Sequence, residues 1–112
     1  MSQDLSQWVA LLQRQVRTRQ YRLTLHAERE RAADKITIAE LEETLLGESC
    51  EIIENYPDDP RRASCLVLGF NGKGEPLHFV CGIPASEKVI VVITLYRPSP
   101  ERWIDWRVRK KE

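Results

Sequence analysis

The segment at residues 88–96, KVIVVITLY, limits the possible folds more than any other part of this sequence. Both alternating sets of its side chains are apolar, which is typical of a strand that is covered on both faces. The run is also far shorter than the roughly 20 apolar residues that a membrane-spanning helix needs. We therefore expect it to be a central strand in the sheet of a soluble protein.

Four other segments are predicted to be strands. They are residues 21–25, 50–56, 63–70 and 77–83. Between the last two, the sequence Asn71-Gly72-Lys73-Gly74 predicts a tight hairpin turn, because Asn and Gly tolerate positive φ. The last three of these segments, followed by the segment at 88–96, predict an antiparallel meander.

Helical periodicity and capping signals predict the remaining elements. Apolar residues at helical spacing predict a helix at residues 5–18, and helix-forming residues predict a short one over the sheet at 26–34. Thr37 and Glu40 form a capping box for a third helix, which Gly47 is expected to end in a left-handed conformation. Ser99 and Pro100 are expected to start a short C-terminal helix. Its two tryptophans, Trp103 and Trp106, would share one face.

Together these elements predict an α+β fold, with N-terminal helices packed on a twisted, mainly antiparallel sheet of four to five strands. The 112 residues fit a single domain. We divide it into an N-terminal helix at 1–20, a core at 21–106 and a basic tail at 107–112. The N-terminus has neither the charged region nor the continuous apolar region of a signal peptide, so we expect a cytoplasmic protein.

Three cysteines, Cys50, Cys65 and Cys81, lie far apart in the sequence with no Cys-x-x-Cys pair. This spacing is unlike a zinc cluster or a disulfide framework, and buried free thiols are expected instead. Two histidines, His26 and His78, have no local ligand spacing, so we expect neither a metal nor another cofactor. A metal-dependent hydrolase that uses both histidines is the weakest alternative.

Charge is unevenly distributed along a chain whose formal net charge is zero. Every charged residue from 36 to 60 is acidic, whereas residues 14–35 and 97–111 are mainly basic. Net neutrality argues against strong nonspecific binding of nucleic acid. The segregation predicts one acidic and one basic face after folding.

Several polar residues stand where sites often form. His26 lies where the predicted strand at 21–25 ends and the next helix begins. His78 faces away from its apolar neighbours in the strand at 77–83. Tyr96 and Arg97 end the most apolar strand, before two prolines that fix the backbone. Each also has a purely structural interpretation. His26 could cap a helix, and His78 could be a histidine whose hydrogen bonds are satisfied within the fold. Tyr96 could be an aromatic residue of the core, and Arg97 a solvated cation.

Three motifs resemble a bacterial family. They are His-Ala-Glu-Arg at residues 26–29, Pro-Leu-His at 76–78 and ITLYRPSPERW at 93–103. The resemblance is to a family of unknown function that is grouped with the RelE, ParE and BrnT toxins. It implies a compact domain of helices on a twisted antiparallel sheet. RelE-type relatives are expected to cleave messenger RNA in the ribosome, and ParE-type relatives to act on gyrase.

The resemblance implies that this protein has endoribonuclease activity. Cleavage through the 2′-hydroxyl needs a base, a cation or donor for the phosphate, and an acid for the leaving oxygen. The candidate catalytic residues are His26, His78 and Tyr96. The candidate substrate-binding residues are Arg29, Arg62 and Arg97.

The alternative is a non-enzymatic interaction module on the same scaffold, with an antitoxin-like or other protein as partner. Convergence of His26, His78, Tyr96 and Arg97 in one cleft would favour the enzyme, and their dispersal would favour the module. The oligomeric state is left open.

Overall fold

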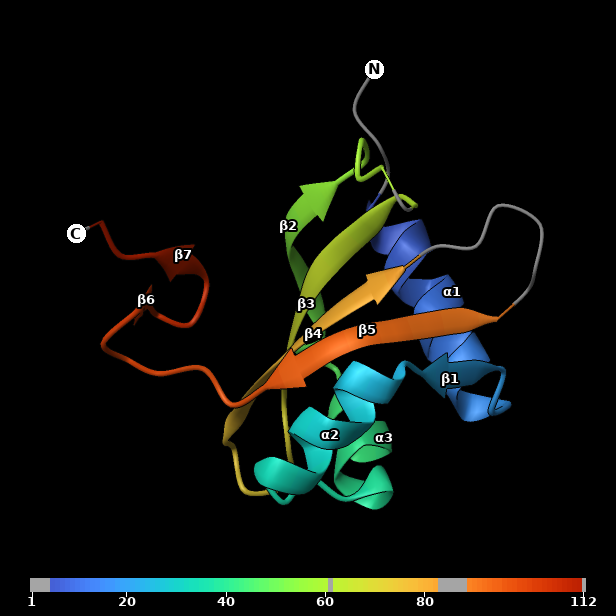
Figure 1. Cartoon of the computed structure of the whole chain (residues 1–112), viewed down its shortest axis with the longest axis horizontal. Helices are drawn as coiled ribbons and strands as arrows, with labels where there is room; N and C mark the ends of the chain where they lie inside the picture. The colour runs from blue at the N-terminus through green and yellow to red at the C-terminus, as the bar shows by residue number, and fades with distance from the viewer. Residues whose placement is uncertain (1–4, 61, 83–88, 112) are drawn as a thin grey trace.

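The computed structural model describes residues 5–60, 62–82 and 89–111. Within them the chain forms three helices and seven strands (Figure 1). The helices are α1 (Leu5–Arg17), α2 (Leu25–Ala33) and α3 (Ile38–Leu45). The strands are β1 (Tyr21–Leu23), β2 (Glu51–Tyr56), β3 (Ser64–Phe70), β4 (Pro76–Gly82), β5 (Ile90–Tyr96), β6 (Trp103–Ile104) and β7 (Val108–Arg109). The predicted α+β class is confirmed.

Strands β1 to β5 form one sheet in the order β1-β5-β4-β3-β2. The pairs β2-β3, β3-β4 and β4-β5 are antiparallel, so the predicted meander is confirmed. The short strand β1 pairs in parallel with the start of β5, from Ile90 to Val92. Strand β5 therefore has a neighbour on both sides along only half of its length.

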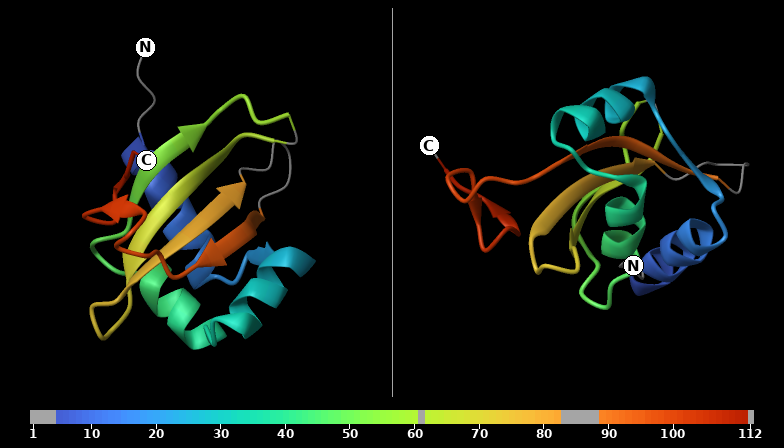
Figure 2. Two further views of the ribbon diagram at one scale, coloured as in Figure 1. Left: turned by 60° about the vertical axis from the view of Figure 1, so that its left-hand side comes forward. Right: turned by 90° about the horizontal axis from the view of Figure 1, so that it is seen from below.

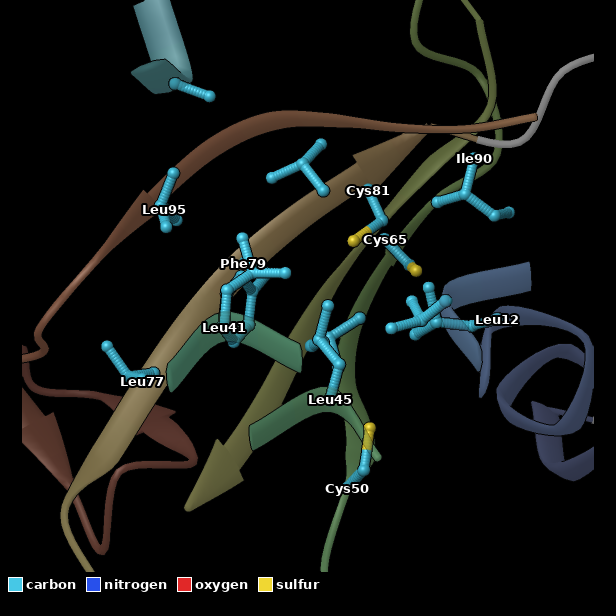
Figure 3. Packing of buried hydrophobic residues seen from close by; sticks show 14 of the residues in the cluster. Leu12, Leu41, Leu45, Cys50, Cys65, Leu77, Phe79, Cys81, Ile90 and Leu95 are labelled. Atoms are coloured by element: carbon cyan, nitrogen blue, oxygen red, sulfur yellow. The ribbon is translucent and has the colours of Figure 1, made fainter. Parts of the chain in front are cut away.

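One face of the sheet carries the hydrophobic core. Side chains from α1 and α3 pack there against alternate residues of β3, β4 and β5 (Figure 3). Phe79 is fully buried at the centre of this face. Helix α3 approaches β3 closely at Gly69, where an added Cβ would lie 2.8 Å from the Thr44 backbone oxygen. A larger residue at this position would push the helix away from the sheet.

The three cysteines belong to this core, as expected. Cys65 and Cys81 are direct partners across β3 and β4, and Cys50 lies just before β2. Burial raises the pKa of the Cys50 and Cys65 thiols to about 12. They are therefore protonated and weakly reactive at neutral pH.

The opposite face of the sheet is covered by the end of the chain. In the left view of Figure 2, the hairpin of β6 and β7 lies in front of the strands and α1 lies behind them. The predicted C-terminal helix is therefore wrong. Asp105 and Trp106 both have positive φ, 52° and 61°, and the Arg107 amide donates to the Ile104 carbonyl across a tight turn. Two consecutive residues with positive φ match a hairpin turn and interrupt a helix.

Two capping predictions have different outcomes. Thr37 caps α3, since its side chain accepts a hydrogen bond from the Glu40 amide. Gly47 does not end that helix in a left-handed conformation; the C-cap is Leu46, with helical φ and ψ. Of the turn glycines, Gly74 has the expected positive φ. Ile83 and Lys88, predicted strand ends, lie outside the described residues.

In the part of the chain that the structure describes, every helix is too short or too polar to cross a bilayer.

Candidate functional site

The face of the sheet beneath the C-terminal hairpin combines apolar and polar side chains. Leu66, Leu68 and His78 are buried there, on the side opposite the core. His78 lies directly across from Leu68 on β3 and from Tyr96 on β5. The antiparallel register thus places an imidazole and a phenol from distant parts of the sequence side by side.

His78 binds the hairpin to the sheet. Its Nε2 lies 2.8 Å from the Trp106 carbonyl oxygen, and its ring packs edge-on against Trp103 at a centroid distance of 4.5 Å. Arg107 pairs with Glu51 on β2, and Arg109 binds Glu54 at 2.9 Å while its guanidinium lies over the Trp103 ring. The hairpin is therefore held mainly by directional polar contacts around one buried tryptophan.

The contacts of His78 determine its protonation state and tautomer. A carbonyl oxygen only accepts, so Nε2 carries the proton that it donates to Trp106. Burial lowers the pKa of His78, although the Trp106 hydrogen bond and the nearby Glu54 carboxylate oppose this change. Nδ1 is therefore an unprotonated acceptor, and the Tyr96 hydroxyl donates to it at 3.0 Å.

Beside this pair lies a cleft of about 960 Å³ between the sheet and the C-terminal segment. The sheet contributes one wall and the segment from Arg97 onward contributes the other. The lining residues are Leu66, Val80, Thr94, Tyr96, Arg97, Pro98, Ser99, Glu101, Arg102, Trp103, Arg109, Lys110 and Lys111. Five of these are cationic, against one carboxylate.

The cations of the cleft fall into two groups. Arg97 forms a two-pronged ion pair with Glu40, and Arg109 does the same with Glu54. In the described residues no carboxylate lies within ion-pair distance of Arg102, Lys110 or Lys111, which are all exposed. These three are the cations available to an anion in the cleft.

Beyond the end of β1, the backbone groups on that edge of β5 form hydrogen bonds with side chains of α2 and its N-cap residue. Thr24 donates to the Ile93 carbonyl at 2.8 Å. The Glu30 carboxylate accepts from the Leu95 amide at 3.1 Å and also from the Thr94 hydroxyl. Side chains here replace the strand that is missing, because backbone groups at a sheet edge need partners.

His26 belongs to this edge. Its side chain is 70% exposed, and its Nε2 lies 3.3 Å from the same Glu30 oxygen that holds Thr94. Since Thr94 lines the cleft, the series of side-chain contacts from His26 to Glu30 to Thr94 connects His26 to the cleft wall. An exposed imidazole next to a carboxylate is suited to proton transfer.

The structure brings some of the candidate residues together and separates others. His78 and Tyr96 are in contact, and Tyr96 and Arg97 line the cleft. His26 reaches the cleft only through Glu30 and Thr94. Arg29 is exposed on α2 and outside the cleft lining, and Arg62 lies over Gly82, also outside it.

Sequence reasoning missed Glu30, Thr94 and the cleft cations Arg102, Lys110 and Lys111. Two signals were available. Glu30 follows His26 by four residues, which places both on one face of a helix. Thr94 is the polar residue within an otherwise apolar run. The three cations carried no signal, because a basic tail looks the same whether it is free or folded onto a sheet.

A metal centre finds no support in the described part of the chain, where no group of three or more His, Cys, Asp or Glu side chains is placed to hold an ion.

Burial raises the pKa of Tyr96 to about 12, although Arg109 opposes the change. Tyr96 is thus a neutral phenol at physiological pH. The cationic side chains of the cleft are suited to binding an anion, and the hydroxyls of Thr94 and Tyr96 are suited to hydrogen bonding.

Fold and site together define a small α+β protein whose mixed sheet carries a cationic cleft beneath a C-terminal hairpin. Residues 23–97 match the family described as a domain of unknown function, DUF4258, and the chain belongs to that family. No significant match was found among curated proteins or among solved structures. The match spans α2, α3 and strands β2 to β5, and ends where the hairpin segment begins.

Proposed function

We propose that this protein is a RelE-like endoribonuclease that binds a single RNA strand in the cleft between the sheet and the C-terminal hairpin. The observation that carries the proposal is the cleft itself, which is lined by two hydroxyls of β5 and by three cations that have no carboxylate partner in the described part of the chain. A cationic groove that follows a backbone is the common feature of proteins that bind single strands. The resemblance of the sequence motifs to toxin families agrees with this activity.

The unpaired cations are assigned to the phosphates. Arg102, Lys110 and Lys111 come from the hairpin and its flanks and face the cleft from one wall. Arg97 and Arg109 are largely neutralised by Glu40 and Glu54, so they shape the cleft and contribute little net charge. This division accounts for a local basic site on a chain with zero net charge.

Strand cleavage is assigned to His26. Its exposed imidazole, beside Glu30, lies outside the cleft lining, and it is assigned to a nucleotide that extends past Thr94, whose 2′-hydroxyl proton it takes. The lysine ammonium groups stabilise the phosphate and protonate the leaving oxygen. His78 is fully buried and acts indirectly, as a positioning residue for Tyr96. Arg29 and Arg62 are not needed for this assignment.

Binding is tested by fluorescence anisotropy with a labelled single-stranded RNA of about eight nucleotides. Replacing Arg102, Lys110 and Lys111 by Ala should lower the slope of log affinity against log salt by about 2, since each phosphate contact contributes roughly 0.7 on single strands. The matched control replaces Arg14, Arg17 and Arg22, which are exposed and lie on α1 and β1. An equal loss in both triple variants would contradict the assignment.

Cleavage is tested on the same RNA by gel electrophoresis. The wild type should cut the strand, and His26→Ala should still bind it without cutting. Induced expression in a bacterium should arrest growth, and the same substitution should relieve the arrest. RNA that binds but remains intact with the wild type would contradict the assignment of cleavage.

A further inference from the structure

The two hydroxyls of β5 that line the cleft have their protons directed away from it. The Thr94 hydroxyl donates to the Glu30 carboxylate, which in its ionised form only accepts. The Tyr96 hydroxyl donates to His78 Nδ1 at 3.0 Å. Both oxygens are therefore left with free lone pairs, which a ligand in the cleft can use.

The direction of the Tyr96 hydrogen bond follows from the hairpin. The Trp106 carbonyl lies 2.8 Å from His78 Nε2 and requires a proton on that nitrogen. With its proton on Nε2, the neutral imidazole has only a lone pair on Nδ1. The phenol must then be the donor, and the docked hairpin determines what Tyr96 presents to the cleft.

We infer that Tyr96 and Thr94 make the cleft selective for RNA over DNA, by accepting hydrogen bonds from 2′-hydroxyl groups. This inference rests on the proposed function, since it specifies the sugar of the strand assigned to the cleft. The two residues lie two apart on one face of β5, roughly 7 Å from each other along the strand. The 2′-hydroxyl is the group by which a protein distinguishes the two nucleic acids.

The arrangement of the two walls gives the bound strand an orientation. Phosphate oxygens carry no proton, so the lone pairs of Thr94 and Tyr96 repel them. The donors that suit a phosphate, Arg102, Lys110 and Lys111, belong to the C-terminal segment. The sugars therefore face β5 and the phosphates face the hairpin.

The test compares the anisotropy of three labelled strands of one sequence: RNA, DNA, and 2′-O-methyl RNA, which keeps the ribose oxygen but lacks its proton. Measurements in the His26→Ala background keep the RNA intact. RNA should bind about tenfold more tightly than DNA, as expected for two net hydrogen bonds of roughly 0.7 kcal/mol each. The 2′-O-methyl strand should bind as weakly as DNA.

Substitutions then assign the selectivity to the two residues. Tyr96→Phe and Thr94→Val should each reduce the RNA to DNA affinity ratio severalfold, because each removes one acceptor for a 2′-hydroxyl proton. Thr94→Ser, which keeps the hydroxyl, should restore the ratio. The matched control is Tyr56→Phe, because Tyr56 is a half-buried phenol on the edge strand β2 that binds Glu54 and lies outside the cleft lining.

Three results would overturn the inference. If RNA and DNA bind equally in a salt-sensitive way, the selectivity is wrong while RNA binding survives. If RNA is preferred but neither substitution lowers the ratio, the selectivity lies elsewhere. If neither nucleic acid binds, the proposed function fails and this inference fails with it.

Discussion

The two faces of the sheet are closed in different ways. On one face, helices α1 and α3 cover a continuous apolar layer centred on Phe79. On the other, a two-stranded hairpin is held by a histidine, a tryptophan and two ion pairs, and it leaves a cleft beside it. Apolar packing is dense and nondirectional, whereas polar contacts hold an element at a few points. The second face can therefore contain a site that the first would fill.

The largest expected effect is on the helix-covered face. Phe79→Ala should lower the free energy of unfolding by about 3 to 5 kcal/mol, because it removes a fully buried ring from the centre of the core. Chemical denaturation followed by circular dichroism measures this loss across the whole chain. A loss below about 1 kcal/mol would mean that this face does not carry the stability.

On the hairpin-covered face, a substitution should destabilise only the hairpin and its contacts. His78→Ala leaves the Tyr96 hydroxyl and the Trp106 carbonyl without their partner and should cost about 1 to 3 kcal/mol. Hydrogen exchange should accelerate at the amides of residues 103–110, while those of β3 and β4 stay protected. Uniform acceleration over the sheet would show instead that the two faces unfold as one unit.

The same histidine predicts a pH dependence. Burial lowers the pKa of His78, so the unfolded chain binds a proton more readily than the folded chain. Stability should therefore be constant above about pH 6.5 and fall as the pH drops below that value, by at most about 1.4 kcal/mol per pH unit for one proton. Denaturation curves at several pH values measure this effect. His78→Gln should remove the slope in this range, and His26→Gln, at the other histidine, should retain it.

The smallest effect is expected where the two faces meet. Glu40 on α3 binds Arg97 at the start of the C-terminal segment, and this hydrogen bond lowers the pKa of Glu40. Glu40→Gln should cost about 0.2 to 1 kcal/mol, since Arg97 is partly exposed and solvent weakens the pair. The loss should shrink in acid, where protonation of Glu40 removes the interaction in the wild type as well. Denaturation at two pH values tests both statements.

The separation of acidic and basic residues along the sequence had a different outcome in the fold from the one predicted. The acidic block predicted one acidic face and the basic tail one basic face. Instead, three glutamates of that block pair with three arginines of the C-terminal segment, as Glu40–Arg97, Glu51–Arg107 and Glu54–Arg109. Part of the segregation is thus satisfied within the molecule. Three cations of the C-terminal segment that have no carboxylate partner among the described residues, Arg102, Lys110 and Lys111, line the cleft.

Much of the fold was predictable, because alternation and capping are local properties. The segment at 88–96 became β5, the turn at Asn71–Gly74 joins β3 to β4, and Thr37 caps α3. The last helix was wrong for a nonlocal reason. Ser99 and Pro100 do start a turn, in which the Arg102 amide donates to the Ser99 carbonyl, but Trp103 then becomes buried at the sheet and the chain reverses.

The candidate site was predictable only in part. His78 and Tyr96 were chosen for their chemistry, and their contact arises from the register of β4 against β5. Glu30 was not chosen, because its importance depends on the early end of β1, which leaves the Leu95 amide without a strand partner. The spacing of Glu30 from His26 indicates a shared helix face, but the role of Glu30 in replacing a missing strand follows only once the pairing of β1 with β5 is known.

By itself, the sequence determined which segments become the five strands of the main sheet, where the three helices lie and that the cysteines are buried, because local propensity and apolar periodicity decide these features. Tertiary structure alone decided that β1 stops halfway along β5, that the basic tail folds back over the sheet and that His78 holds it there. These depend on which groups meet across long stretches of chain. The cleft exists because directional contacts, rather than apolar packing, close that face.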